Sequence, residues 1–313
     1  MTSRSGRPIV VVMAVPLVLI VGVLVWATRG DGDGARSSSA AAASSSVPRA
    51  TANRFQGARA FALLREQVRD YGHRPAGSPK LRALAERLRE LMPKGRFEDV
   101  AGHPGLRNVV GTVRGRKPVI VVGAHYDVEA KPDGFVGAND GAAGTAAVVE
   151  LARVFATTRR PKGARGLRFV LFDGEEEPAG CEPFIQCGLR GSRAYARRNG
   201  ANVHRMILLD YIAEKSGLRF RRELGSHETL WNRLRSAAHA VGVGSLFAAG
   251  SSAGAILDDH TPFAERGIPA IDIIDFDYPP RDSLEDDLDK VSARSLDAVG
   301  EAVYRLVARQ RRR

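Results

Sequence analysis

The sequence predicts an α/β domain with a mixed, largely parallel central sheet flanked by helices. Short apolar runs of strand character alternate with helical segments from residue 52 to residue 313, which is the pattern of a parallel sheet. Histidine and acidic residues directly follow two of these runs, and an open α/β sheet places its active site at such strand ends. An apolar fraction of 44% is sufficient for a sizeable core.

The first residues predict a membrane anchor. Residues 9–27 carry no charge, and a run of about 19 such residues can span a bilayer. Arg4 and Arg7 precede the run and favour a cytoplasmic N-terminus. The run is longer than the apolar region of a signal peptide, and it ends in Trp-Ala-Thr-Arg, a poor cleavage site. We expect residues 1–27 to form a cytoplasmic tip and a single-pass signal anchor in the cell membrane, with the rest of the chain on the extracytoplasmic side. The alternative is cleavage within the Ala/Ser tract that follows.

Residues 28–51 predict a flexible linker. They are rich in Ser, Ala and Gly, a composition that cannot bury a core. The folded domain is therefore expected at residues 52–313.

The domain is expected to begin with two helices and two strands. Apolar residues at helical spacing predict helices over 55–71 and 80–92, separated by a turn-rich break at 73–79. Residues 97–100 and 108–113 have strand character, and 114–118 read as a turn.

The following elements alternate between strand and helix. We expect strands at 119–122, 167–172, 206–209 and 268–274, and helices at 145–156, 189–198, 229–241 and 293–309. No internal repeat is visible, so a single domain is predicted.

The net charge of +12 does not by itself indicate a nucleic-acid partner. The basic residues are dispersed, apart from short clusters at 219–222 and 311–313, and no nucleic-acid-binding motif is present. We expect a solvated basic surface and no bound nucleic acid.

The two cysteines are close in sequence. Cys181 and Cys187 would form a disulfide in an oxidising compartment outside the cytoplasm, and two free thiols are the alternative. The pair alone lacks the four ligands of a structural zinc site.

Residues 118–177 carry the chemistry. His125 and Asp127 follow the first buried strand, Asp140 lies in a Gly-rich loop before a helix, and Glu175 and Glu176 follow the next strand. Each residue alone has a structural explanation, such as a helix N-cap for Asp140. Together they form the His and carboxylate set that zinc accepts.

Five motifs, HYD, GAND, FDGEE, LLD and DDHTPF, occur in this order between about residues 55 and 310. In order and spacing they resemble the co-catalytic zinc aminopeptidases of clan MH, a superfamily that also contains the animal-type glutaminyl cyclases. The resemblance implies a three-layer, zinc-exopeptidase-like catalytic domain. It also implies two zinc ions that share a bridging carboxylate, and a peptide substrate with a free N-terminus.

The resemblance assigns the metal ligands by position. His125 and Asp210 would hold one ion, Asp140 would bridge, and Glu176 would hold the second ion. The last family ligand, a histidine, falls on Asp282 here. Asp282 would either ligate as a carboxylate, with a harder site that could prefer another divalent ion, or leave a weakened site with one ion.

Three further roles follow from the resemblance. Glu175 would be the general base for the attacking water, and Asp127 would orient an imidazole. Asp258 in DDHTPF corresponds to a carboxylate that hydrogen-bonds the substrate in the cyclases.

The leading prediction is a membrane-anchored, metal-dependent aminopeptidase. One alternative is a glutaminyl-peptide cyclotransferase with one zinc ion. The other is a catalytically impaired, peptide-binding relative, because Asp282 replaces the last histidine.

Overall fold

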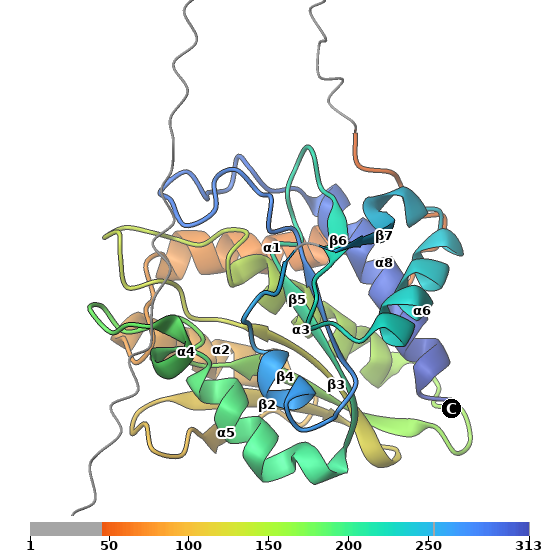
Figure 1. The fold of residues 1–313 in the computed structure, drawn as a ribbon, viewed down its shortest axis with the longest axis horizontal. Coiled ribbons are helices and arrows are strands. Elements are labelled where there is room, and N and C mark those ends of the chain that lie inside the picture. Colours follow the sequence, from red (N-terminus) through yellow and green to blue (C-terminus); the bar gives the residue numbers. More distant parts are fainter. Residues whose placement is uncertain (1–45, 253, 313) are drawn as a thin grey trace, which may run out of the picture. The chain divides into compact units, whose positions relative to one another are not determined.

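The computed structural model describes residues 46–252 and 254–312 (Figure 1). In chain order the elements are α1 (Gly57–Glu66), the π-helix η1 (Gln67–Tyr71), α2 (Pro79–Leu91), β1 (Arg96–Asp99), β2 (Arg107–Val113), β3 (Arg116–His125), α3 (Ala142–Thr157), β4 (Arg165–Phe172), α4 (Phe184–Cys187), α5 (Arg190–Asn199), η2 (Gly200–Asn202), β5 (Val203–Asp210), β6 (Phe220–Arg222), α6 (Glu228–His239), η3 (Gly244–Leu246), β7 (Phe247–Ser252), α7 (Thr261–Ala264), β8 (Ala270–Ile274) and α8 (Ala293–Gln310).

A mixed six-stranded sheet forms the centre of the domain, in the order β1-β2-β4-β3-β5-β8. Strands β4, β3, β5 and β8 are parallel to one another, whereas β2 is antiparallel to both β4 and β1. The antiparallel pairs lie at one side of the sheet, and the four parallel strands make up the rest. The predicted fold class is confirmed.

The parallel strands are apolar on both faces because helices cover both. Along β3, Ile120 and Val122 face the larger core, which also contains residues of α1, α2, α3, α6 and α8. Val121 faces a smaller core with Tyr195 of α5 and Phe263 of α7. This alternation explains why the strands appear in the sequence as continuous apolar runs rather than as alternating ones.

A second, two-stranded sheet pairs β6 with β7 in parallel. Phe220 and Phe247 stack with ring centroids 5.0 Å apart, and the edge of Trp231 from α6 packs against Phe247. These two strands were not predicted from the sequence, because β6 has only three residues and the apolar part of β7 ends at Ala249.

The folded unit begins earlier than predicted. Val47 is buried, Ser46 forms a bridge with Ser216, and Thr51 N donates to Val241 O at 2.9 Å. The last residues of the predicted linker therefore belong to the domain, because Val47 provides an apolar side chain that the Ser/Ala/Gly tract before it lacks.

The first predicted helix is also divided. α1 ends at Glu66 and continues as η1 to Tyr71. Strand β3 starts at Arg116, inside the predicted turn, because Arg116 pairs with Arg165 of β4.

The predicted anchor at residues 9–27 lies outside the described residues. Across the residues that are described, no helix is both long and apolar enough to cross a membrane.

Candidate functional site

The site lies at the carboxyl ends of β3, β4 and β5. His125 is the last residue of β3 and Asp210 is the last residue of β5, while Glu175 and Glu176 follow β4 after a short turn. The three strands are adjacent and parallel, with His125 in register with Phe172 of β4. Parallel pairing therefore brings side chains that are far apart in the sequence to one edge.

Asp140 reaches the same place from the loop before α3. The next residue, Gly141, has a φ of 80°, and a Cβ atom there would lie 2.7 Å from the carbonyl oxygen of Asp127. Glycine is required both by this backbone conformation and by this close approach. The Gly-rich sequence is thus what allows Asp140 to pack against the end of β3.

His125 and the carboxylates form two overlapping clusters. Its Nε2 atom lies 3.1 Å from Asp140 Oδ1 and 3.4 Å from Asp210 Oδ1. The donor atoms of His125, Asp140 and Asp210 lie within 4.8 Å of one another, as do those of His125, Glu175 and Glu176. All five side chains are buried.

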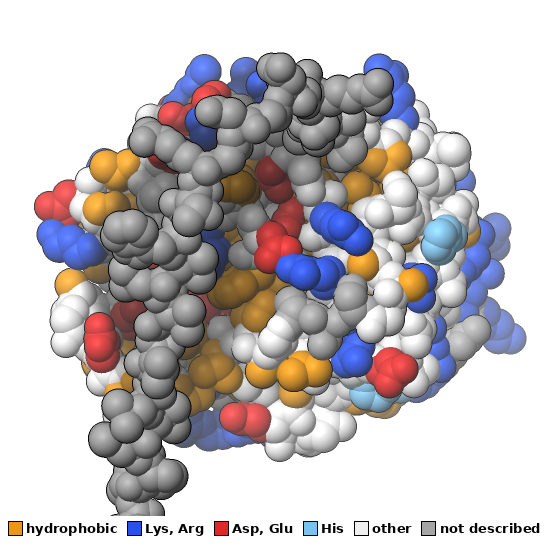
Figure 2. Space-filling model, turned by 45° about the horizontal axis from the view of Figure 1, so that its top comes forward, with side chains coloured by type: hydrophobic (Ala, Val, Ile, Leu, Met, Phe, Trp, Pro, Cys, Tyr) orange, Lys and Arg blue, Asp and Glu red, His pale blue; other side chains and the backbone are white. Residues whose placement is uncertain are grey.

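A cavity of about 260 Å³ opens above these clusters. Figure 2 shows acidic side chains gathered in the hollowed centre of the molecular face, with basic side chains beside them. The charged side chains that line the cavity are Glu129, Asp140, Glu175, Glu176, Glu177, Asp210, Asp258, Arg281 and Asp282. One arginine among eight carboxylates leaves the cavity strongly acidic.

Burial without enough positive charge raises the pKa values of several of these carboxyl groups. Burial raises the pKa of Glu176 well above its ordinary range, with Asp140 and Glu175 adding to the shift. Burial also raises the pKa of Asp210 to about 7, although the hydrogen bond from His125 opposes the change. Burial lowers the pKa of His125, but hydrogen bonds with Asp140 and Asp210 outweigh it and raise that pKa well above its ordinary value.

The donor set fits a divalent cation. A cluster of buried carboxylates with one imidazole is costly unless a cation balances it, and imidazole nitrogen with carboxylate oxygen is a donor set that zinc accepts. His125, Asp140 and Asp210 would hold one ion, and Glu176 lies close enough to contribute to a second.

Asp127 makes a different contact from the one expected. Its Oδ1 and Oδ2 atoms accept the backbone N–H groups of Glu175 and Glu176, both at 3.3 Å. The distance from Asp127 Oδ1 to His125 Nδ1 is 3.9 Å, which is longer than a hydrogen bond. Asp127 thus fixes the turn that carries the two glutamates rather than the imidazole ring.

Asp282 lies next to Asp140 but outside both clusters. The hydroxyl of Tyr211 is 2.8 Å from Asp140 Oδ2 and 3.0 Å from Asp282 Oδ1, so it lies between the two carboxylates. Among the described residues, the groups whose donor atoms converge within 4.8 Å do not include Asp282. Its side chain is 46% exposed, and Arg281 Nη1 lies 3.4 Å from its Oδ2 atom. The expected ligand is therefore at the rim of the cavity.

Asp258 belongs to a third buried cluster, with His260 and Asp272. Nε2 of His260 lies 3.2 Å from Oε1 of Glu223, and its Nδ1 lies 4.0 Å from Oδ2 of Asp272. Asp258 also lines the cavity, so it connects this cluster to the site.

Two supporting residues were missed in the sequence analysis. Arg74, read there as part of a turn, is fully buried and donates to the carbonyl oxygens of Tyr126, Val136 and Gly137, at the two ends of the loop between His125 and Asp140. Asp286 accepts the N–H groups of Asn139 and Asp140 at 2.9 and 3.0 Å. A charged residue within a turn gives no sequence signal for such contacts, because its partners are backbone atoms far along the chain.

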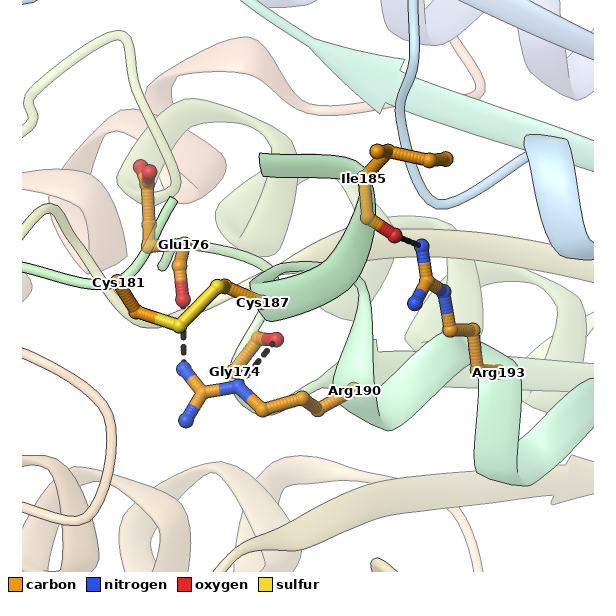
Figure 3. Close-up of a disulfide and its surroundings, with 7 residues drawn as sticks. All are labelled: Gly174, Glu176, Cys181, Ile185, Cys187, Arg190 and Arg193. Carbon is orange, nitrogen blue, oxygen red and sulfur yellow. Dashed lines mark hydrogen bonds between the residues drawn. A yellow bond between two sulfur atoms is a disulfide. The ribbon is translucent and has the colours of Figure 1, made fainter. Parts of the chain in front are cut away.

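A disulfide joins Cys181 and Cys187 in the segment after Glu177 (Figure 3). Arg190, at the start of α5, donates to the carbonyl oxygens of Gly174 and Glu176. Figure 3 shows that this guanidinium lies beside the disulfide and under the turn that carries Glu176. The turn is therefore held at its N–H groups by Asp127 and at its carbonyl oxygens by Arg190.

The family can now be stated from comparison with known proteins. Residues 108–307, more than half of the chain, match the profile of peptidase family M28. The chain belongs to peptidase family M28. The resemblance predicted from the five motifs is confirmed, and membership supports an enzyme of the metallopeptidase type.

Relatives of the M28 domain carry two activities. Aminopeptidase YwaD of Bacillus subtilis is 27% identical over 230 residues, which cover 66% of this chain and 46% of that protein. Glutaminyl-peptide cyclotransferase of Bothrops jararaca is 26% identical over 239 residues, which cover 63% and 64%. The chain thus spans between about half and two thirds of these curated relatives.

A solved glutaminyl cyclase structure has a similar fold. The crystal structure of Porphyromonas gingivalis glutaminyl cyclase has a TM-score of 0.72 and 26% identity, with coverage of 83% of this chain and 100% of that one.

Proposed function

We propose that this M28 domain is a metal-dependent aminopeptidase that hydrolyses N-terminal residues from peptides. The observation that carries the proposal is the pair of overlapping clusters around His125 at the floor of an acidic cavity. M28 membership and the similarity to an aminopeptidase support the same reaction class.

Zinc is the cofactor that this donor set favours. His125, Asp140 and Asp210 would hold one ion, and Asp140 with Glu176 would hold the second. When bound, zinc polarises a peptide carbonyl and lowers the pKa of water toward neutrality. Whether Asp282 completes the second site decides between two ions and one.

Residues of the chain would supply proton transfer and the positioning of the base. Glu175 is the proposed general base, and its pKa is raised well above the ordinary range by burial and by Asp258, while His125 opposes the shift. A base with a raised pKa is better matched to proton transfer near neutral pH. Asp127 keeps Glu175 in place through its backbone N–H.

The substrate's ammonium group is expected to bind among the carboxylates of the cavity. Glu129 lines it and is half-buried, and burial together with Asp140 and Asp282 raises its pKa to about 7. A cation placed beside Glu129 would restore its ionised form. This gives a physical basis for selecting a free N-terminus.

A cyclotransferase is the second candidate. It is favoured by the similarity to glutaminyl cyclases and by the position of Asp258, which is buried at the cavity and offers a carboxylate to a substrate amide. In this reaction the α-amino group attacks the side-chain amide of an N-terminal glutamine, and ammonia leaves. The N-terminal residue is cyclised, and the peptide keeps its length.

One experiment separates these functions. The purified full chain is incubated with a panel of unblocked peptides, including Gln-initiated ones, with added zinc or with a chelator, and the products are identified by mass spectrometry. We expect zinc-dependent shortening by one residue. Ammonia loss without shortening would establish the cyclotransferase instead, and no metal-dependent product from any peptide would favour the peptide-binding relative.

A further inference from the structure

Three stretches that carry basic but no acidic residues meet at the amino ends of the central strands. They are residues 114–117 at the β2–β3 turn and the start of β3, residues 158–166 at the α3–β4 connection and the start of β4, and residues 309–312 at the end of α8. Arg116 N donates to Ala164 O at 3.0 Å, and Arg165 N donates to Arg311 O at 2.7 Å. Figure 1 shows the turn, the connection and the C-terminal end at the same corner of the domain. Charges that are dispersed in sequence are therefore gathered in space.

Six exposed side chains of these stretches form what we term the basic face: Arg114, Lys117, Arg159, Arg160, Lys162 and Arg312. The backbone beneath them is well supported. Arg311 is buried, its guanidinium lies 5.5 Å from the ring centroid of Phe155, and its Nε donates to Arg165 O at 3.2 Å. The basic face thus rests on packed structure rather than on a free tail.

The positive charge of the basic face is not neutralised locally. None of its six side chains forms an ion pair with an acidic residue in 46–252 or 254–312. The surroundings show the same positive potential: burial and the neighbouring Arg205 and Arg165 lower the pKa of His204 to about 4. Clustered like charges repel one another and favour an anionic partner.

The basic face and the cavity lie at opposite ends of the strands. Strand β3 runs from Arg116 beside the basic face to His125 in the site, and a ten-residue strand spans about 30 Å. A large partner bound at the basic face would therefore leave the cavity open.

We propose that the basic face binds the anionic headgroups of a phospholipid membrane and holds the domain with its cavity turned away from the bilayer. The sequence favours lipid over other polyanions, because the uncharged stretch 9–27 is predicted to enter a membrane. The 18 residues 28–45 between that stretch and the described domain reach at most about 60 Å when extended, which is enough for the basic face to contact the same bilayer. The proposal does not depend on which reaction the cavity performs.

The test uses the full chain reconstituted into vesicles of phosphatidylcholine alone or with phosphatidylglycerol. Hydrogen exchange of the amides of residues 159–164 is measured in both. We expect exchange to be slower by about threefold or more in the anionic vesicles at low salt, and the difference to vanish at 0.5 M salt because screening shortens the range of surface electrostatics.

Two triple variants supply the comparison. Arg159→Glu, Arg160→Glu and Lys162→Glu together should abolish the difference between the two lipids. The matched control, Arg65→Glu, Arg69→Glu and Lys80→Glu, changes the net charge equally at exposed positions of α1, η1 and α2 and should retain it. Thermal unfolding midpoints show whether both variants fold.

Three results would overturn the proposal. They are equal exchange in the two lipids for the unmodified chain, equal loss in both triple variants, and protection by duplex DNA but not by anionic vesicles. The last result would identify the basic face as a nucleic-acid surface.

Discussion

Glu175 and Glu176 are adjacent and both buried, yet their surroundings differ. The donor atoms of both lie near His125, and Asp127 fixes both backbone N–H groups. Both carbonyl oxygens are held as well, that of Glu175 by the N–H of Leu189 and that of Glu176 by Arg190. Glu175 lies nearer the charges of Asp258 and Asp259, whereas Glu176 lies nearer that of Asp140. At the scale of single residues, this difference supports Glu175 as the base and Glu176 as the ligand.

Replacing the proposed base should remove turnover and leave the metal in place. Glu175→Gln keeps the size of the side chain but cannot accept a proton, so we expect kcat to fall by about 10²- to 10⁴-fold. Zinc content after dialysis should stay within error of the unmodified chain. Glu182→Gln, an exposed change in the disulfide loop, is the control. Full activity of Glu175→Gln would exclude the assigned role.

Asp282 is the candidate for the last ligand of the second metal position. If this carboxylate ligates, Asp282→Ala should reduce the zinc retained after dialysis from two equivalents toward one, and Asp282→His should restore it with a softer donor. Metal is counted by atomic spectroscopy, with Asp287→Ala as the exposed control. Equal zinc in the unmodified chain and in Asp282→Ala would show that Asp282 is not a ligand.

At the scale of elements, the segment between β8 and α8 forms part of the cavity wall. It supplies Asp282 at the rim, and Asp286 ties it to the loop before α3. Asp286 also accepts the hydroxyl of Tyr278 at 2.8 Å. The Asp286 carboxylate thus joins two segments about 145 positions apart in sequence. It can do so because its two oxygen atoms accept several hydrogen bonds at once.

Removing the hydrogen bonds from Asn139 and Asp140 to Asp286 should destabilise the domain. Asp286→Asn replaces one acceptor oxygen with a donor group, leaving a buried N–H without a partner, so the free energy of unfolding should fall by about 1–3 kcal/mol. Urea denaturation measures the loss, and Asp287→Asn at an exposed neighbouring position is the control. An unchanged unfolding midpoint would show that the tie contributes nothing.

The interaction between Glu214 and Asp275 predicts that the stability of the domain depends on pH. Glu214, which bridges toward Val291 through its backbone, is half-buried, and burial together with a hydrogen bond and the charge of Asp275 raises its pKa from 4.5 to about 8. Because the folded state holds the proton more tightly, this contribution to stability is fully present below about pH 4.5 and is lost as pH rises through 8.

The measurement compares unfolding midpoints in urea between pH 4.5 and 8.5. Glu214→Gln does not ionise, so its stability should fall less across this window than that of the unmodified chain. Glu265→Gln, at an exposed site, should follow the unmodified chain. Parallel curves for all three proteins would contradict the assignment.

At the scale of the whole molecule, the domain has an acidic cavity at one end of its strands and a basic face at the other. The predicted anchor and linker would place this domain outside the cytoplasm, where the disulfide between Cys181 and Cys187 would persist. The disulfide agrees with the predicted location outside the cytoplasm, and the charge distribution with the orientation proposed above.

Localisation can be tested directly. We expect the full chain to remain in the membrane fraction after an alkaline carbonate wash, because an apolar span is retained by the hydrophobic effect rather than by charge. Externally added protease should remove the domain from intact spheroplasts while a cytoplasmic marker survives. Release by carbonate would indicate a cleaved or peripheral chain.

The sequence alone determined the fold class, the order of the main elements and the set of acidic and histidine residues at strand ends. These features are local: an apolar run followed by His125, or by Glu175 and Glu176, is visible without knowing which strands pair. It also determined that Asp282 stands at the position of a ligand histidine in the resembled family. Each of these features can be read from residues that are close together in the sequence.

Only the tertiary structure decided the contacts between distant segments. It placed Asp127 on the amides of Glu175 and Glu176 instead of on His125, put Tyr211 between Asp140 and Asp282, and brought Asp286 to the loop before α3. It also gathered the basic face from three separate stretches. The physical reason is common to all of these: hydrogen bonds to backbone atoms and charge proximity depend on strand register and helix packing, which side-chain periodicity does not encode.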